Sequence, residues 1–117
     1  MRPYTRADRV AVIMQRTLSD ILLKEVKDPR LAMASITSVK LSKDLRHARV
    51  YFVTTGGGKD PEEVAEGFRQ AQGVLKRFLG RELDLRYMPE IQFFHDDSYD
   101  YGSRIENLLH SLGSENG

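Results

Sequence analysis

Residues 61–84, PEEVAEGFRQAQGVLKRFLGRELD, decide the fold of this chain. Apolar side chains recur there every three or four positions, which predicts one long amphipathic helix with a buried stripe. The stripe consists of Val64, Phe68, Ala71, Leu75, Phe78 and Leu79. Asp60 and Pro61 give this helix a clear start, because aspartate caps helices and proline suits their first position.

The step Ala71-Gln72-Gly73 interrupts that pattern. Glycine costs roughly 1 kcal/mol relative to alanine inside a helix, so the step predicts a kink or a close backbone approach. Basic residues follow it at once, namely Lys76, Arg77, Arg81 and Arg86. A bent helix with cations on its second arm favours phosphate binding over catalysis, although a helical glycine more often accommodates packing.

The segment before this stretch predicts a helix and a β-hairpin. Residues 5–27 are expected to form the first helix, with Thr5 as its N-cap and Asp8 as its capping-box partner. Pro29 ends that helix, because a residue before proline is pushed out of the helical region. Residues 39–53 alternate between apolar and polar, which predicts two strands around a turn at 42–46. Ile36 is out of phase with Val39, which predicts either a bulge or a later strand start.

The segment after it predicts a last strand at residues 91–95 and a final amphipathic helix from Ser98. Residues 114–117 are expected to be a disordered tail. The predicted order is α-β-β-α-(kink)-α-β with a C-terminal helix, and no linker is long enough to divide it. We therefore expect a single α+β domain over residues 1–113, with helices packed on one face of a three-stranded sheet.

Composition narrows the class of protein. The chain has 117 residues and no cysteine, which excludes disulfides and thiolate metal sites. No apolar leader and no long apolar run are present, so we expect a cytoplasmic protein without membrane contact. Residues 1–58 carry eleven Lys and Arg against five Asp and Glu, whereas residues 89–117 carry one against six. Such segregation is compatible with a polyanion on one face.

The chemistry of an enzyme is not visible in the sequence. The three histidines lie on different predicted elements and lack the spacing of a zinc site. Asp96, Asp97 and Asp100 have the chemistry to hold a hard cation, but acidic residues before a helix are usually caps. Residues 56–59 read Gly-Gly-Gly-Lys and do not meet the phosphate-loop pattern. We expect no catalysis, cofactor, metal or small-molecule substrate.

The predicted order of elements resembles a type II KH domain, an RNA-binding fold. In most KH domains the turn between two helices is Gly-x-x-Gly, but here Ala71-Gln72-Gly73 stands there and none of the nine glycines has another three residues on. Together with three further motifs, this step resembles the bacterial ribosome-binding factor A family from about Arg9 to Leu109. The motifs are VKDPRL at 26–31, LSKDLRHARVY at 41–51 and PEIQFFHDDS at 89–98.

This resemblance implies an assembly factor for the small (30S) ribosomal subunit. Such proteins bind the immature particle and its 16S rRNA, assist late maturation and processing of the rRNA 5′ region, matter most in the cold and leave before translation. They act by binding, as cytoplasmic monomers. The family also implies a ribosome-associated GTPase that acts in their release.

Basic residues from four segments are expected to converge on one face and contact rRNA phosphates, which makes affinity fall with salt. For any single Lys or Arg, a solvated surface position is an equal alternative. Ala71 and Gly73 are expected to keep the bend open to the RNA backbone. The cations are Arg6, Arg9 and Arg16 on the first helix, Lys27 and Arg30 at its corner, Lys43 and Arg46 in the hairpin turn, and Lys76, Arg77, Arg81 and Arg86 on or beyond the kinked helix.

Two rival functions remain at this point. One is a KH-like module that binds any single-stranded RNA, against which the missing Gly-x-x-Gly speaks. The other is a protein–protein adaptor that uses the exposed sheet, and salt-insensitive binding would favour it. Tyr51 and Phe94 are expected on that outward sheet face, where cross-strand packing is favoured over the stacking of a base.

Overall fold

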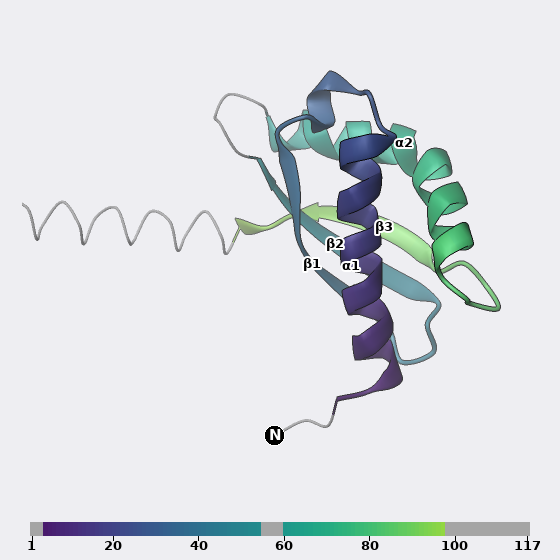
Figure 1. Cartoon of the computed structure of the whole chain (residues 1–117). Helices are drawn as coiled ribbons and strands as arrows, with labels where there is room; N and C mark the ends of the chain where they lie inside the picture. Colours follow the sequence, from purple (N-terminus) through teal and green to yellow (C-terminus); the bar gives the residue numbers. More distant parts are fainter. Residues whose placement is uncertain (1–3, 55–59, 98–117) are drawn as a thin grey trace, which may run out of the picture.

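The computed structural model describes residues 4–54 and 60–97. Its elements are α1 (Arg6–Lys24), the short 3-10 helix η1 (Pro29–Leu31), β1 (Ala34–Leu41), β2 (His47–Thr54), α2 (Pro61–Glu82) and β3 (Glu90–His95). Two long helices pack on one three-stranded sheet, which confirms the predicted α+β class (Figure 1). The predicted C-terminal helix, the tail and the triple glycine lie outside the described residues.

α1 begins where the sequence predicts and ends earlier. The Thr5 hydroxyl accepts the Asp8 N–H, and the Asp8 carboxylate accepts the Thr5 N–H at 2.9 Å, so the capping box is confirmed. The helix ends at Lys24 instead of residue 27. Val26 packs against the core beyond that end, which requires the chain to leave the helix before Pro29.

The β-hairpin has the predicted bulge and turn. β1 and β2 pair antiparallel, and their register shifts between Ile36 and Ser38. In the turn, Asp44 accepts the Ser42 hydroxyl at 2.6 Å and the Arg46 N–H at 3.0 Å. These hydrogen bonds hold the pKa of the Asp44 carboxyl below its usual value. Leu45 adopts a φ of 62°, in the left-handed region that side chains other than glycine rarely occupy.

β3 pairs parallel with β2, so the strand order is β1-β2-β3. A parallel pair requires a long crossover, and α2 is that crossover. Side-chain amides tie each helix to an outer strand. The Gln15 amide of α1 donates to the Thr37 carbonyl at 3.1 Å, and the Gln72 amide of α2 donates to the Ile91 carbonyl at 2.8 Å.

The core lies between the helices and one sheet face. Met14 of α1, Phe52 of β2 and Phe68 of α2 are all fully buried. The Phe68 ring stacks on Phe93 with centroids 4.7 Å apart and tilts against Phe52 at 5.1 Å. Burying one such side chain stabilises the fold by about 1.5–3 kcal/mol, so Phe68 anchors α2 on the sheet.

α2 is one helix whose direction changes along its length. The Asp60 carboxylate accepts the Glu62 N–H at 3.0 Å, and Pro61 holds the first position as predicted. In Figure 1 the teal first part and the green second part of α2 run in different directions. The predicted kink is thus a bend within a single helix, without a break into two. No helix in the described residues is both long and apolar enough to cross a membrane.

Candidate nucleic-acid interface

The outward face of α2 carries two exposed cations and a glycine with no neighbouring atoms over it. Gly73, Arg77 and Arg81 are spaced four residues apart, which places them on one side of the helix, and all three are exposed. A Cβ atom built at Gly73 would have no neighbour within 4 Å. Neither arginine forms an ion pair with another residue that the structure describes. We call Gly73, Arg77 and Arg81 the α2 surface.

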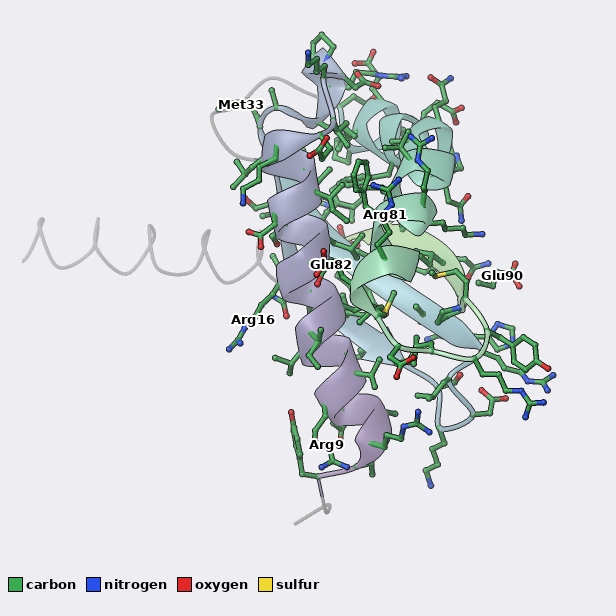
Figure 2. The ribbon with its side chains drawn as sticks, turned by 45° about the vertical axis from the view of Figure 1, so that its right-hand side comes forward. Arg9, Arg16, Met33, Arg81, Glu82 and Glu90 are labelled. Atoms are coloured by element: carbon green, nitrogen blue, oxygen red, sulfur yellow. The ribbon has the colours of Figure 1, made fainter. Side chains whose placement is uncertain are left out.

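Phe78 supports both arginines of the α2 surface. The guanidinium carbons of Arg77 and Arg81 lie 5.8 and 5.3 Å from the centre of the Phe78 ring. These distances are within the range of cation–π contacts, so the ring orients two charges toward solvent. In Figure 2, Arg81 projects from the second part of α2.

The groove between α1 and α2 has a different character. It encloses about 220 Å³ and is lined by Thr17, Asp20, Ile21, Lys24, Glu25, Phe78 and Glu82. Three carboxylates against one cation repel phosphate there. An anionic ligand is therefore favoured on the outer side of α2 and disfavoured in this groove.

A second basic group forms at the tip of the hairpin. At the start of β3 the Glu90 N–H donates to the carbonyl of Arg46, the residue before β2, at 2.8 Å. That bond brings the connection after α2 beside the hairpin turn, so Arg46 and Tyr87 line the same depression, and Arg86 lies against the Tyr87 ring. We call Lys43, Arg46 and Arg86 the hairpin end.

Tyr87 lies beside the hairpin end and was not predicted as a site residue from the sequence. Its ring is 66% exposed, and the Arg86 guanidinium lies 5.5 Å from the ring centre. The sequence signal for it is an Arg-Tyr pair just before a Met-Pro turn at residues 88–89. An aromatic ring among cations is a common element of nucleic-acid interfaces.

The cations of α1 spread over its outer side. Arg6, Arg9 and Arg16 are all exposed. Figure 1 shows the start of α1 at the same end of the molecule as the hairpin turn, which brings Arg6 and Arg9 toward the hairpin end. Arg16 lies farther along α1 and, in Figure 2, points to the side away from Arg81. It does not join the α2 surface.

Arg30 serves the architecture of the corner. Its guanidinium donates to the Asp28 carboxylate at 2.7 Å and to the Gln70 side-chain oxygen at 2.6 Å. The Asp28 hydrogen bond raises the pKa of Arg30. A Cβ at Gly67 would lie 3.1 Å from Leu31, so η1 presses directly on α2 at that glycine. Arg30 fastens this contact, while Lys27 beside it is exposed.

The predicted residues thus fall into groups that do not all share one face. Ala71 packs against the core, and Lys76 is half-buried beside the α2 surface. The α2 surface and the hairpin end each gather several predicted cations. Arg16, Lys27 and Arg30 stand apart from both groups.

The remaining candidate features have local partners. The Asp96 carboxylate accepts the Thr37 hydroxyl at 2.8 Å, and the His95 imidazole lies 3.0 Å from the Asp97 carboxylate. Within residues 4–54 and 60–97, no three His, Asp or Glu side chains gather in a way that could hold a metal ion. The Tyr51 and Phe94 rings are 5.8 Å apart on adjacent strands, which confirms the predicted cross-strand packing.

Three shifted pKa values accompany hydrogen bonds at the surface. They belong to Arg30, Asp44 and Glu66. The pKa of Glu66 is lowered chiefly by its hydrogen bond from Arg69. Such shifts are typical of surface ion pairs and not of a buried acid–base pair. The arrangement is suited to binding an extended anion.

Comparison with known proteins shows which family this chain matches in sequence. The family model described as "Ribosome-binding factor A" matches residues 6–109. The ribosome-binding factor A of Desulfatibacillum aliphaticivorans is 48% identical over 113 residues, covering 97% of this chain and 92% of that protein. The protein of that name from Syntrophus aciditrophicus is 42% identical over 115 residues, covering 98% and 94%.

Solved structures share the fold. The crystal structure of ribosome-binding factor A from Thermus thermophilus matches with a TM-score of 0.69 at 24% identity, over 76% of this chain and 93% of that one. A Thermus thermophilus ribosome binding factor A homology model, fitted into the cryo-EM map of a complex with 30S, matches with a TM-score of 0.60 at 25% identity, over 72% and 88%.

Proposed function

The chain belongs to the ribosome-binding factor A family, and on that premise we propose that it binds the small (30S) ribosomal subunit during subunit assembly. Its contact on the particle is 16S rRNA, and the α2 surface supplies the cations that meet the phosphates. The protein acts in the cytoplasm as a monomer, through binding and without catalysis.

The observation that carries this proposal is the open line of Gly73, Arg77 and Arg81 along α2. Glycine lets another backbone approach more closely than any other residue, because it has no Cβ. Two guanidinium groups that form no ion pair within the described residues follow on the same face, and guanidinium matches the geometry of phosphate oxygens. This surface therefore suits a phosphate backbone that runs along the second part of α2.

Binding energy is sufficient for an assembly role. A protein that binds one rRNA arrangement more tightly than another shifts the population toward the first, by no more than its difference in affinity. We propose that the favoured arrangement is the one that permits late maturation and processing of the 16S rRNA 5′ region. Misfolded RNA pairings persist longer in the cold, so the need for this bias increases there.

We further propose that the protein leaves the small subunit before translation. A ribosome-associated GTPase that favours the mature arrangement would remove the differential affinity and free the protein. The proposal places that partner on the subunit and assigns no residue of this chain to it.

Co-sedimentation with small subunits, large subunits and free single-stranded RNA over a salt series tests the proposal. The Arg77→Glu/Arg81→Glu variant should lose pelleting with small subunits. The control Lys40→Glu/Arg49→Glu changes the net charge equally at two exposed cations of β1 and β2, on the sheet face opposite the helices, and should still pellet. Neutral replacements, Arg77→Ala/Arg81→Ala, should lower the slope of log affinity against log salt by about 1.4–1.8.

Three outcomes would contradict the proposal. Equal pelleting with all three partners would leave a general RNA-binding module. Binding that does not respond to salt would favour a protein adaptor. Equal losses in the test and control charge reversals would remove the α2 surface as the contact.

A further inference from the structure

The hairpin end contains a shallow depression of about 430 Å³, lined by Arg46, His47, Tyr87, Met88 and Glu90. We propose that this depression holds one unpaired nucleobase, preferably guanine, stacked on Tyr87 with its edge toward Glu90. The proposal deepens the proposed function and rests on it, because it names a second contact of the protein with single-stranded RNA.

Tyr87 is an exposed ring on a fixed support. It is 66% exposed, yet the two residues that follow it are held in place. Pro89 is fully buried, and Met88 packs against the core, where its Cε would lie 3.7 Å from a Cβ at Gly80. The hydrogen bond from the Glu90 N–H to the Arg46 carbonyl closes the other side. A ring held in this way loses little entropy when a base stacks on it.

The charges around Tyr87 suit a nucleotide. Arg86 lies over its ring at 5.5 Å, and the exposed Arg46 lines the same depression. Neither arginine forms an ion pair with another described residue. They stand on two different segments, so they can hold the phosphates on both sides of one base. The exposed Lys43 adds a third cation at this end.

Glu90 supplies the base preference. Among the described residues it is the one acid that lines the depression, its side chain is 65% exposed, and its carboxylate lies 3.9 Å from His47 Nδ1. That distance is too long for a hydrogen bond, so the carboxylate can accept new donors. A carboxylate has two acceptor oxygens, and the Watson–Crick edge of guanine offers two adjacent N–H groups. Adenine, cytosine and uracil each place an acceptor atom beside their donor, which the carboxylate repels.

The chain has no tryptophan, so Tyr87→Trp creates a single fluorescent reporter in the depression. Leu23→Trp is the control, because Leu23 is 84% exposed and lies at the other end of α1, away from the hairpin end. Each variant is titrated with single-stranded U-rich 8-mers that carry one central G, A, C or U. We expect saturable quenching of the residue 87 reporter, strongest and tightest with G, and little change at residue 23.

Affinity measurements then separate stacking from charge. Tyr87→Ala should weaken binding of the G-containing 8-mer by roughly tenfold, since a stacked base contributes about 1–3 kcal/mol. Tyr87→Phe should retain binding, and Leu23→Ala should not change it. Glu90→Gln should keep the quenching and lose most of the preference for G. Thermal melts of each variant establish that it is folded.

The two proposals fail in distinguishable ways. If no 8-mer quenches the residue 87 reporter while the wild-type chain still pellets with small subunits, the depression is not a base site and the proposed function stands. If quenching with a preference for G persists in the Arg77→Glu/Arg81→Glu background, the depression binds RNA independently of the α2 surface. Equal quenching by all four bases, or by duplex RNA, would overturn the assignment to guanine or to an unpaired base, respectively.

Discussion

Replacing Gly73 with alanine should make this protein more stable. A Cβ built at Gly73 meets nothing within 4 Å, and the residue does not adopt a positive φ. Alanine therefore fits the existing backbone without a clash. It also gains no buried contact, because the site is exposed. The expected change comes from the backbone alone, through the smaller conformational freedom of alanine in the unfolded chain.

The magnitude follows from helix propensity. Glycine inside a helix is less favourable than alanine by about 0.5–1 kcal/mol. For a chain of this size, that free energy corresponds to a rise in Tm of about 2–5 °C. In urea it corresponds to a midpoint increase of about 0.3–0.6 M with an unchanged slope.

Urea denaturation followed by circular dichroism at 222 nm measures this change, with Gly67→Ala as the matched control. Gly67 lies in the same helix, but its Cβ would be 3.1 Å from Leu31 and 3.4 Å from Arg30. The same gain in propensity is opposed there by a steric conflict with η1. We expect Gly67→Ala to gain less than Gly73→Ala, or to lose stability.

The result also bears on function. If Gly73 stays open for an RNA backbone, the Gly73→Ala protein should bind small subunits more weakly although it is more stable. A destabilised Gly73→Ala protein would refute the structural reasoning. Equal stabilisation by both alanines would refute the assignment of the close approach to Gly67. Unchanged subunit binding would remove Gly73 from the interface.

Three further predictions concern the corner, the core and the hairpin turn. Asp28→Ala should lower the free energy of unfolding, measured by urea denaturation, by about 1 kcal/mol. The substitution removes the cap of η1 and the carboxylate partner of Arg30. An effect below about 0.3 kcal/mol would contradict that role. Phe68→Ala should cost about 3–5 kcal/mol, since it removes a ring between two aromatic partners, and a smaller loss in denaturant melts would argue against α2 being anchored there. The pKa of the Asp44 carboxyl is held below its ordinary value of 3.8, so its contribution to stability is present above about pH 4 and is lost as the pH falls through the lower folded-state pKa. Asp44→Asn should therefore melt below the wild type at pH 7 and together with it near pH 2, and a constant difference would count against the hydrogen bonds.

Local features of this fold were predictable from the sequence. The capping box at Thr5, the bulge after Ile36 and the start of α2 at Pro61 each depend on residues within a few positions of one another. The end of α1 was not predictable, because Val26 leaves the helix to pack against the core. Packing against residues that are distant in the sequence sets the end of α1, and no local sequence pattern indicates it.

The candidate site was predictable in kind and less so in arrangement. The spacing of Arg77 and Arg81 already places them on one helix face. The approach of Arg46 to Tyr87 depends on the parallel register of β2 and β3, which no short-range sequence pattern indicates. Arg30 appears in the sequence as one more surface cation, yet the crossing of η1 and α2 commits it to Gln70.

The Gln72 contact described above has a consequence for self-association. In the β2–β3 pair, the N–H groups of Glu90 and Asp96 point to β2, so the Ile91 carbonyl belongs to the alternate set that faces away from β2. Among the described residues β3 is an edge strand, and Gln72 donates to that carbonyl. A neighbouring chain that added a strand beside β3 would have to displace this side-chain amide first. α2 thereby protects that edge of the sheet against edge-to-edge aggregation.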